Sequence, residues 1–184
     1  MDSTTKRIAI NYGLIVSAVA VGYTLVAYII NEAWLSSQVG GIVMLFAMLL
    51  IPYFGVREFK KANDGYATFR EAFSAYVLPL ILSAVVGLAF NWLMHNVIDS
   101  ELATRMGERV YERFAEMPED QRKGVMTFMG AANDAELKAE SIKMTTEQVT
   151  ILGMLKSSGV GIIMYALVGL IVAAITKKNR PEFQ

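Results

Sequence analysis

Residues 8–30 read IAINYGLIVSAVAVGYTLVAYII, a run of 23 positions without one charged side chain. A charged group at the middle of a bilayer costs roughly 2.5–3.5 kcal/mol, so charge-free runs of this length are typical of segments that lie in lipid. About 20 residues of α-helix cross a hydrocarbon core of roughly 30 Å. In lipid the backbone groups must bond to one another, as they do within a helix. The run therefore predicts a membrane-spanning helix.

Three further stretches have the same character, and we expect four transmembrane helices at about 8–30, 34–56, 72–94 and 155–176, the last free of charge from Ser157 onward. Buried helices of a soluble bundle would show a polar face, which these stretches lack. Ala18-Val19-Ala20 resembles a signal-peptide cleavage site, but the apolar run continues to Ile30, so we expect a retained helix. The sequence thus predicts an all-α integral membrane protein, with residues 1–184 as a single membrane domain.

The composition argues against several classes of function. The chain has 184 residues with 17 basic and 17 acidic side chains, one histidine and no cysteine. Without cysteine there are no disulfides or thiolate ligands, and one histidine argues against histidine-rich metal sites. A formal net charge of zero argues against general nucleic-acid binding. The expected spans hold no internal ionisable side chain, which argues against proton-coupled transport.

The distribution of basic residues predicts which way the helices cross. Nine lysines and arginines lie in the N-terminal segment, the connection between the second and third helices and the C-terminal tail, whereas the short turn at 31–33 has none. Lys and Arg favour the cytoplasmic side of short connections. We therefore expect both termini in the cytoplasm and the connection 96–150 outside, as a helical insert.

The connection between the second and third spans is the most patterned part of the chain. Asn63-Asp64-Gly65 predicts a turn, because Gly65 can adopt a positive φ. Thr68, followed three residues later by Glu71, predicts a capping box at the start of the third helix. The basic residues here are candidates for contact with lipid headgroups: Arg57, Lys60, Lys61 and Arg70. An ordinary anchored turn and a ligand or partner site both fit this pattern.

Three sequence runs carry a family resemblance. REFKKANDGYATFREAF at 57–73, KRIAINYGL at 6–14 and NWLMHNVIDSEL at 91–102 resemble the family catalogued as domain of unknown function 4199, over nearly the whole chain. The resemblance implies a small multi-pass protein of the bacterial inner membrane. The family supplies no catalytic residues to carry over.

One face of the third expected span consists of small or polar residues at every fourth position: Ala75, Pro79, Ser83, Gly87 and Asn91. Small residues allow helices to approach closely in lipid, and an asparagine can bond across the interface. This face is therefore a candidate for packing within the bundle, for contact with a second copy of the chain, or for a polar path.

The connection outside the membrane holds seven basic and eleven acidic residues. Residues 100–117 predict an amphipathic helix, with the apolar positions Leu102, Met106, Val110, Phe114 and Met117 on one face and ion pairs Arg105–Glu108, Arg109–Glu112 and Arg113–Glu116 on the other. This helix can lie on the membrane, pack on its neighbours or hold a partner. Thr145 with Gln148 predicts a further capping box, and thus a helix that starts near Thr146.

These features favour a structural or accessory role in the membrane without enzymatic activity, cofactor or metal. Phosphate loops, zinc-protease motifs and serine elbows do not occur in the sequence. The expected partners are the lipid bilayer and either a second copy of this chain or another membrane protein. The alternative is a small oligomeric transporter or channel for an uncharged or lipid-like solute, lined by the face from Ala75 to Asn91.

Overall fold

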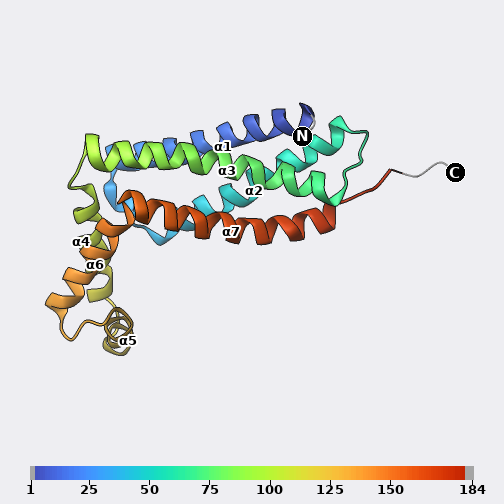
Figure 1. Cartoon of the computed structure of the whole chain (residues 1–184). Coiled ribbons are helices and arrows are strands. Elements are labelled where there is room, and N and C mark those ends of the chain that lie inside the picture. Colours follow the sequence, from blue (N-terminus) through green and yellow to red (C-terminus); the bar gives the residue numbers. More distant parts are fainter. Residues whose placement is uncertain (1–2, 181–184) are drawn as a thin grey trace. The chain divides into compact units, whose positions relative to one another are not determined.

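Residues 3–180 are described by a computed structural model (Figure 1). The elements in chain order are α1 (Ser3–Ile30), the 3-10 helix η1 (Glu32–Trp34), α2 (Gln38–Ala62), α3 (Phe69–Leu93), the π-helix η2 (Met94–Ile98), α4 (Leu102–Ala115), α5 (Glu119–Met129), α6 (Asp134–Gln148) and α7 (Ile151–Thr176). This range holds no β-strand, only an isolated antiparallel bridge between Ala67 and Lys178. The all-α prediction is therefore confirmed.

Four helices are long and apolar enough to cross a membrane: α1, α2, α3 continued by η2, and α7. They coincide with the four predicted spans, and the predicted insert between the third and fourth contains α4, α5 and α6. All four extend past the predicted spans: α1 begins at Ser3, α2 continues to Ala62, α3 with η2 covers Phe69–Ile98, and α7 begins at Ile151. Lys60 and Lys61 in the last turn of α2 favour the extension of that helix, since cations stabilise the negative end of the helix dipole.

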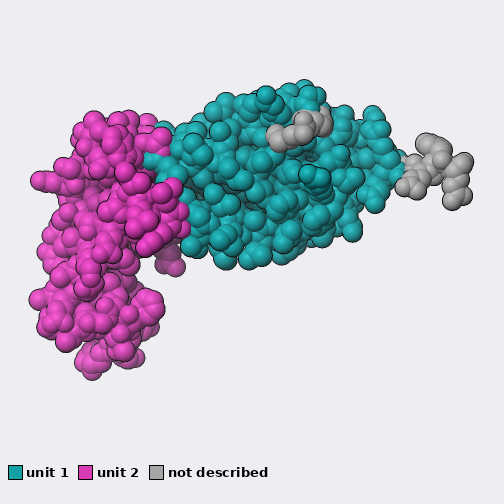
Figure 2. All heavy atoms as spheres, in the orientation of Figure 1, with its two compact units in different colours: residues 1–23, 42–88, 158–184 teal, residues 24–41, 89–157 magenta. Residues whose placement is uncertain are grey.

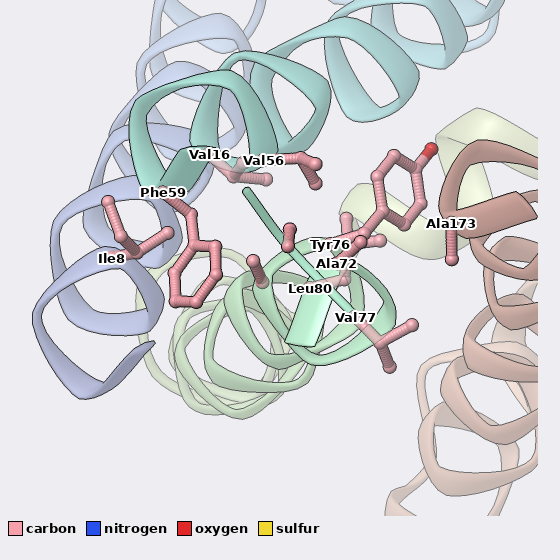
Figure 3. Close-up of a cluster of buried hydrophobic side chains, with 11 residues drawn as sticks. Ile8, Val16, Val56, Phe59, Ala72, Tyr76, Val77, Leu80 and Ala173 are labelled. Atoms are coloured by element: carbon pink, nitrogen blue, oxygen red, sulfur yellow. The ribbon is translucent and has the colours of Figure 1, made fainter. Parts of the chain in front are cut away.

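The chain forms two compact units (Figure 2). Unit 1 comprises residues 1–23, 42–88 and 158–184, and unit 2 comprises residues 24–41 and 89–157. The core of unit 1 is a cluster of buried apolar side chains centred on α3, with Tyr76 among its largest fully buried members (Figure 3). Ile8 of α1 and Phe59 of α2 join the same cluster. Its interior is thus filled by side chains of the chain itself.

Glycines set the distances between the helices of unit 1. A Cβ on Gly13 of α1 would stand 3.0 Å from the carbonyl oxygen of Pro79 on α3, and one on Gly55 of α2 would stand 3.2 Å from the ring of Tyr12. A Cβ on Gly169 of α7 would likewise stand 3.0 Å from the Tyr76 ring. Close approach at small residues increases van der Waals contact, a main source of helix association in lipid.

The connection between α2 and α3 in unit 1 has the predicted turn and cap. Gly65 has a φ of 83° and Asp64 a φ of 56°, so both residues adopt the left-handed backbone conformation. The backbone N–H of Thr68 donates to Glu71 Oε2 at 2.8 Å, and the N–H of Glu71 donates to Thr68 Oγ1 at 3.3 Å. This reciprocal pair is a capping box, which confirms that α3 starts here.

In unit 2, α4 packs along α6. A Cβ on Gly107 of α4 would stand only 2.6 Å from the Cα atom of Ile142, so the two backbones are in close contact. Leu102 and Gly107 are buried and the other predicted apolar positions of α4 are half-buried. Packing on a neighbouring helix therefore accounts for much of the predicted apolar face of 100–117.

The predicted capping box at Thr145 and Gln148 is wrong. α6 continues through these residues, and the Thr145 hydroxyl donates to the Ile142 carbonyl at 2.8 Å instead. Thr150 is the residue that caps α7, since its Oγ1 accepts the N–H of Gly153 at 3.0 Å. A hydroxyl inside a helix can bond back to the preceding turn, so the same sequence pattern arises without a helix start.

Candidate functional site

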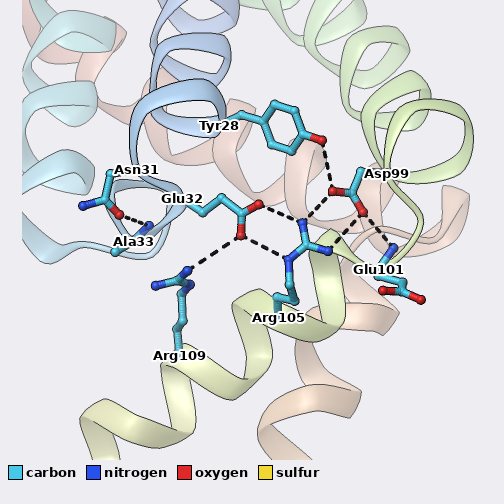
Figure 4. Close-up of polar contacts among 8 residues, drawn as sticks. All are labelled: Tyr28, Asn31, Glu32, Ala33, Asp99, Glu101, Arg105 and Arg109. Atoms are coloured by element: carbon cyan, nitrogen blue, oxygen red, sulfur yellow. Dashed lines mark hydrogen bonds and ion pairs between the residues drawn. The ribbon is translucent and has the colours of Figure 1, made fainter.

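The principal polar cluster of unit 2 is centred on Arg105 of α4 (Figure 4). Its Nη2 and Nε atoms donate to the two carboxylate oxygens of Glu32 at 2.8 and 3.1 Å. Its Nη1 and Nη2 atoms also donate to Asp99 at 3.2 and 2.5 Å. The Tyr28 hydroxyl donates to Asp99 at 3.1 Å, and Arg109 Nη2 lies 3.7 Å from Glu32. These five residues are called the Arg105 cluster below.

Local structure places each carboxylate of the Arg105 cluster. Asn31 accepts the N–H of Ala33 at 3.0 Å, which starts η1 and orients Glu32 in its first turn. Asp99 ends η2, where its N–H donates to the Met94 carbonyl at 2.8 Å. Arg105 then lies in the first turns of α4, at hydrogen-bonding distance from both carboxylates.

The Arg105 cluster holds its carboxylates in the ionised form. Hydrogen bonds from Arg105, with a smaller contribution from Tyr28, lower the pKa of Asp99 from 3.8 to about 2. The hydrogen bond from Arg105 also lowers the pKa of Glu32, and the two carboxylates together raise the pKa of Arg105. Both carboxylates therefore remain ionised at neutral pH, and the two guanidinium groups balance them in charge.

This arrangement is suited to holding segments together. A carboxylate with a depressed pKa is a poor proton donor at neutral pH, and its oxygens here already accept hydrogen bonds. The paired geometry of Arg105 with Glu32 is the fork-to-fork contact that gives arginine–carboxylate pairs their directionality. The cluster ties α4 to η1 and to the residue that follows η2, all within unit 2.

The sequence did not reveal this cluster. We predicted that Arg105 pairs with Glu108 and Arg109 with Glu112, but both arginines face Glu32, and Glu108 pairs with Lys138 of α6 at 2.9 Å. Ion pairs between residues one turn apart on an exposed helix are weak, so the arginines instead bind carboxylates that offer better hydrogen-bond geometry. The sequence held one hint of this cluster, because Glu32 is the only charged residue between the first two predicted spans. Its partner Arg105 lies 73 residues away, so no local sequence pattern predicts the pair.

The candidate face on α3 is divided between the two units. Ala75, Pro79 and Ser83 are buried in unit 1, where Gly13 of α1 approaches the Pro79 carbonyl. At Gly87 a Cβ would meet nothing within 4 Å. Asn91 belongs to unit 2 and is exposed. The first three residues therefore serve packing within the chain, whereas Gly87 is half-buried with room for a Cβ and Asn91 is exposed.

The candidate basic residues also differ in their surroundings. Lys60 is half-buried, and its Nζ atom donates to the carbonyl oxygen of Thr176 at the end of α7 at 2.8 Å. Arg57, Lys61 and Arg70 are exposed. Lys60 therefore stabilises a helix end, where a cation also meets the negative end of the dipole. The guanidinium or ammonium groups of the other three make no ion pair with residues 3–180.

Within residues 3–180 no three or more His, Cys, Asp or Glu side chains are grouped so that they could hold a metal ion. The single histidine, His95, lies in η2, and its Nδ1 atom is buried without a hydrogen-bond partner in that range.

Residues 11–178 match the family described as protein of unknown function (DUF4199). The chain belongs to the DUF4199 family. Comparisons with curated proteins and with solved structures return no match.

The DUF4199 match includes the parts on which the site depends. It covers most of α1, all of α2 to α6 and α7, and therefore every member of the Arg105 cluster and both candidate faces. The family assignment confirms the resemblance seen in the sequence and, with the four apolar helices, is consistent with a membrane protein of uncharacterised role.

Proposed function

We propose that the chain is a multi-pass protein of the bacterial inner membrane that acts without catalysis, as a structural or accessory protein, through contacts between helices. The observation that carries this proposal is the closed packing of unit 1. Three pairs of helices meet at glycines, and the small residues Ala75, Pro79 and Ser83 are used in that packing. A polar path along this face would require the same residues to line open space.

The polar chemistry of unit 2 supports the same proposal. Glu32 and Asp99 are the carboxylates closest to the ends of the candidate spans in unit 2, and both are held by arginines. Catalysis by either would require release from Arg105. We propose that α4 to α6 present a surface to the lipid bilayer, a second copy of this chain or another membrane protein.

The distribution of charge supports cytoplasmic termini. Contacts within unit 1 bring the basic segments to one end: Tyr12 donates to Glu58, Lys60 to the end of α7, and Ala67 pairs with Lys178. The nine basic residues of these segments accompany three acidic ones within residues 3–180: Glu58, Asp64 and Glu71. Such an excess favours the cytoplasmic side.

Labelling of introduced cysteines tests the topology, because the natural chain has no cysteine. Phe128 on α5 is 91% exposed, and Lys177 follows α7. We expect a charged, membrane-impermeant maleimide to label Phe128→Cys in intact spheroplasts and Lys177→Cys only after permeabilisation. The reverse pattern would contradict the proposed orientation, and labelling of both in intact spheroplasts would contradict a membrane crossing by α7.

The same approach separates the structural role from a transporter or channel. The open surroundings of Gly87 are the observation that favours a polar path. A thiol in lipid stays protonated and reacts slowly, whereas one in a water-filled path forms the reactive thiolate. We expect Gly87→Cys to resist the charged maleimide, as does the buried control Ala75→Cys. Rapid labelling at Gly87 that a solute slows would support transport and refute the structural proposal.

A further inference from the structure

The outward face of α2 in unit 1 carries a row of large apolar side chains. Val43, Phe46, Leu50 and Phe54 follow one another at spacings of three and four residues, so they share one face of the helix. They are 48–57% exposed, whereas Val56 and Phe59 on the other face are fully buried in the core (Figure 3).

Two basic residues continue the same row. Arg57 follows Phe54 by three positions and Lys61 follows Arg57 by four, so both extend the outward face in the last turns of α2. Both are exposed, and neither makes an ion pair with any residue of the described range 3–180. The acidic neighbour Glu58 is turned toward α1, where it accepts a hydrogen bond from Tyr12 at 2.9 Å.

The cations at this end of unit 1 differ in their partners. Lys60 donates to the Thr176 carbonyl, Lys178 lies 5.0 Å from the centre of the Tyr66 ring, and Arg180 lies 3.6 Å from Asp64. Those three have partners within the chain. Within residues 3–180, Arg57 and Lys61 have no ion-pair partner. Lys6, Arg7, Arg70 and Lys177 share that property, but only Arg57 and Lys61 continue the apolar row of α2, one helical turn apart.

The length of the row matches one leaflet of a bilayer. Phe46 and Arg57 are separated by eleven residues, or about 16 Å at the helical rise of about 1.5 Å per residue. Half of a hydrocarbon core of roughly 30 Å is about the same distance. An acyl chain can therefore lie along the apolar side chains while its headgroup phosphate meets the two cations.

We propose that this face of α2 binds one phospholipid with an anionic headgroup, its phosphate held by Arg57 and Lys61 and an acyl chain lying along Phe46, Leu50 and Phe54. Two cations without an ion-pair partner in residues 3–180 favour a lipid with net negative charge over a zwitterionic one, whose own ammonium group already neutralises its phosphate. The inference rests on insertion of the chain into a bilayer, which the proposed function also requires.

The test uses the full chain in nanodiscs that contain phosphatidylglycerol and phosphatidylcholine with identical acyl chains. Native mass spectrometry after mild extraction measures the apparent affinity for each lipid. We expect the wild type to retain phosphatidylglycerol preferentially, and Arg57→Gln with Lys61→Gln to weaken that binding about thirtyfold, since each basic residue near the surface contributes roughly one kilocalorie per mole.

Three comparisons make the result specific. The double variant Lys6→Gln with Arg7→Gln removes the same charge from α1 and should keep the preference. Arg57→Lys with Lys61→Arg preserves both charges and should also keep it, which separates lipid binding from folding. Phosphatidylglycerol with six-carbon chains should bind more weakly than the long-chain lipid, because it leaves most of the apolar row uncovered.

Equal losses in the two glutamine pairs would indicate a diffuse positive field and would overturn the inference, as would equal binding of short and long chains. A chain that enters nanodiscs but shows no preference for phosphatidylglycerol contradicts this inference alone. A chain that does not enter them contradicts the proposed function as well.

Discussion

Replacing Arg105 by alanine removes the central group of the Arg105 cluster and leaves Glu32 and Asp99 without their principal partner. Fully buried charge-assisted hydrogen bonds contribute about 1.5–3 kcal/mol, and exposed ion pairs about 0.2–1 kcal/mol. The side chains of Arg105, Glu32 and Asp99 are 34%, 21% and 16% exposed, so screening places this cluster between those limits. Arg105→Ala removes two carboxylate contacts of about 1 kcal/mol each, so we expect it to cost about 2 kcal/mol of stability in unit 2.

Thermal unfolding in detergent, followed by circular dichroism, measures this loss. For a chain of this length about 1 kcal/mol corresponds to a shift of about 2–4 °C, so the variant should melt about 4–8 °C below the wild type. Backbone amides of α4 should also exchange their hydrogens faster. Arg105→Lys retains the charge but not the forked geometry, so its melting temperature should lie between those of the wild type and Arg105→Ala.

Arg113→Ala is the matched control, because Arg113 lies exposed on the same helix and makes no ion pair with residues 3–180. We expect Arg113→Ala to have the same melting temperature as the wild type. A double-mutant cycle with Glu32→Gln should show that the effects of the two substitutions are not additive. If Arg105→Ala and Arg113→Ala melt together, or if the cycle is additive, the cluster does not hold unit 2 together.

Three more outcomes follow from the structure. The pKa of Asp99 is lowered to about 2, so its contribution to stability is fully present above about pH 4 and is lost as the pH falls toward 2. Acid should therefore accelerate amide hydrogen exchange in α4 of the wild type far more than in Arg105→Ala, which lacks the arginine partner. Gly13→Ala should lower the melting temperature, since its Cβ would stand 3.0 Å from a backbone oxygen of α3. Gly87→Ala should be neutral or stabilising, because a Cβ there meets nothing within 4 Å. Equal melting temperatures of the two variants would refute the close approach of α1 and α3 at Gly13. Gly107→Ala should destabilise unit 2 by about 1–3 kcal/mol, because the added Cβ would contact the α6 backbone. Gly124→Ala on α5 should not, because a Cβ there meets nothing within 4 Å. Unchanged amide hydrogen exchange in α6 of Gly107→Ala would show that α4 and α6 are not in close contact.

Local patterns predicted the features that depend on neighbouring residues. The capping box of Thr68 and Glu71 and the left-handed Gly65 formed as predicted, because each needs only a few consecutive residues. The box at Thr145 did not form, since α6 continued and the hydroxyl bonded backward instead. A capping pattern is therefore informative only where the preceding helix has already ended.

The roles of charged residues were harder to predict. Lys60 and Lys61 are adjacent and chemically alike, yet one bonds to the end of α7 and the other stays exposed, according to the face of α2 on which each lies. Arg105 was expected to pair within its own helix and instead joins Glu32 and Asp99. Both outcomes depend on which helices are neighbours.

The sequence by itself determined the number, approximate position and apolar character of the four long helices, because the cost of charge in lipid acts on each residue independently of the rest of the fold. Tertiary structure alone decided which small residues are packed and which lie open, and which carboxylate each arginine meets. Those properties arise from contacts between segments far apart in the chain, whose distances no local pattern encodes.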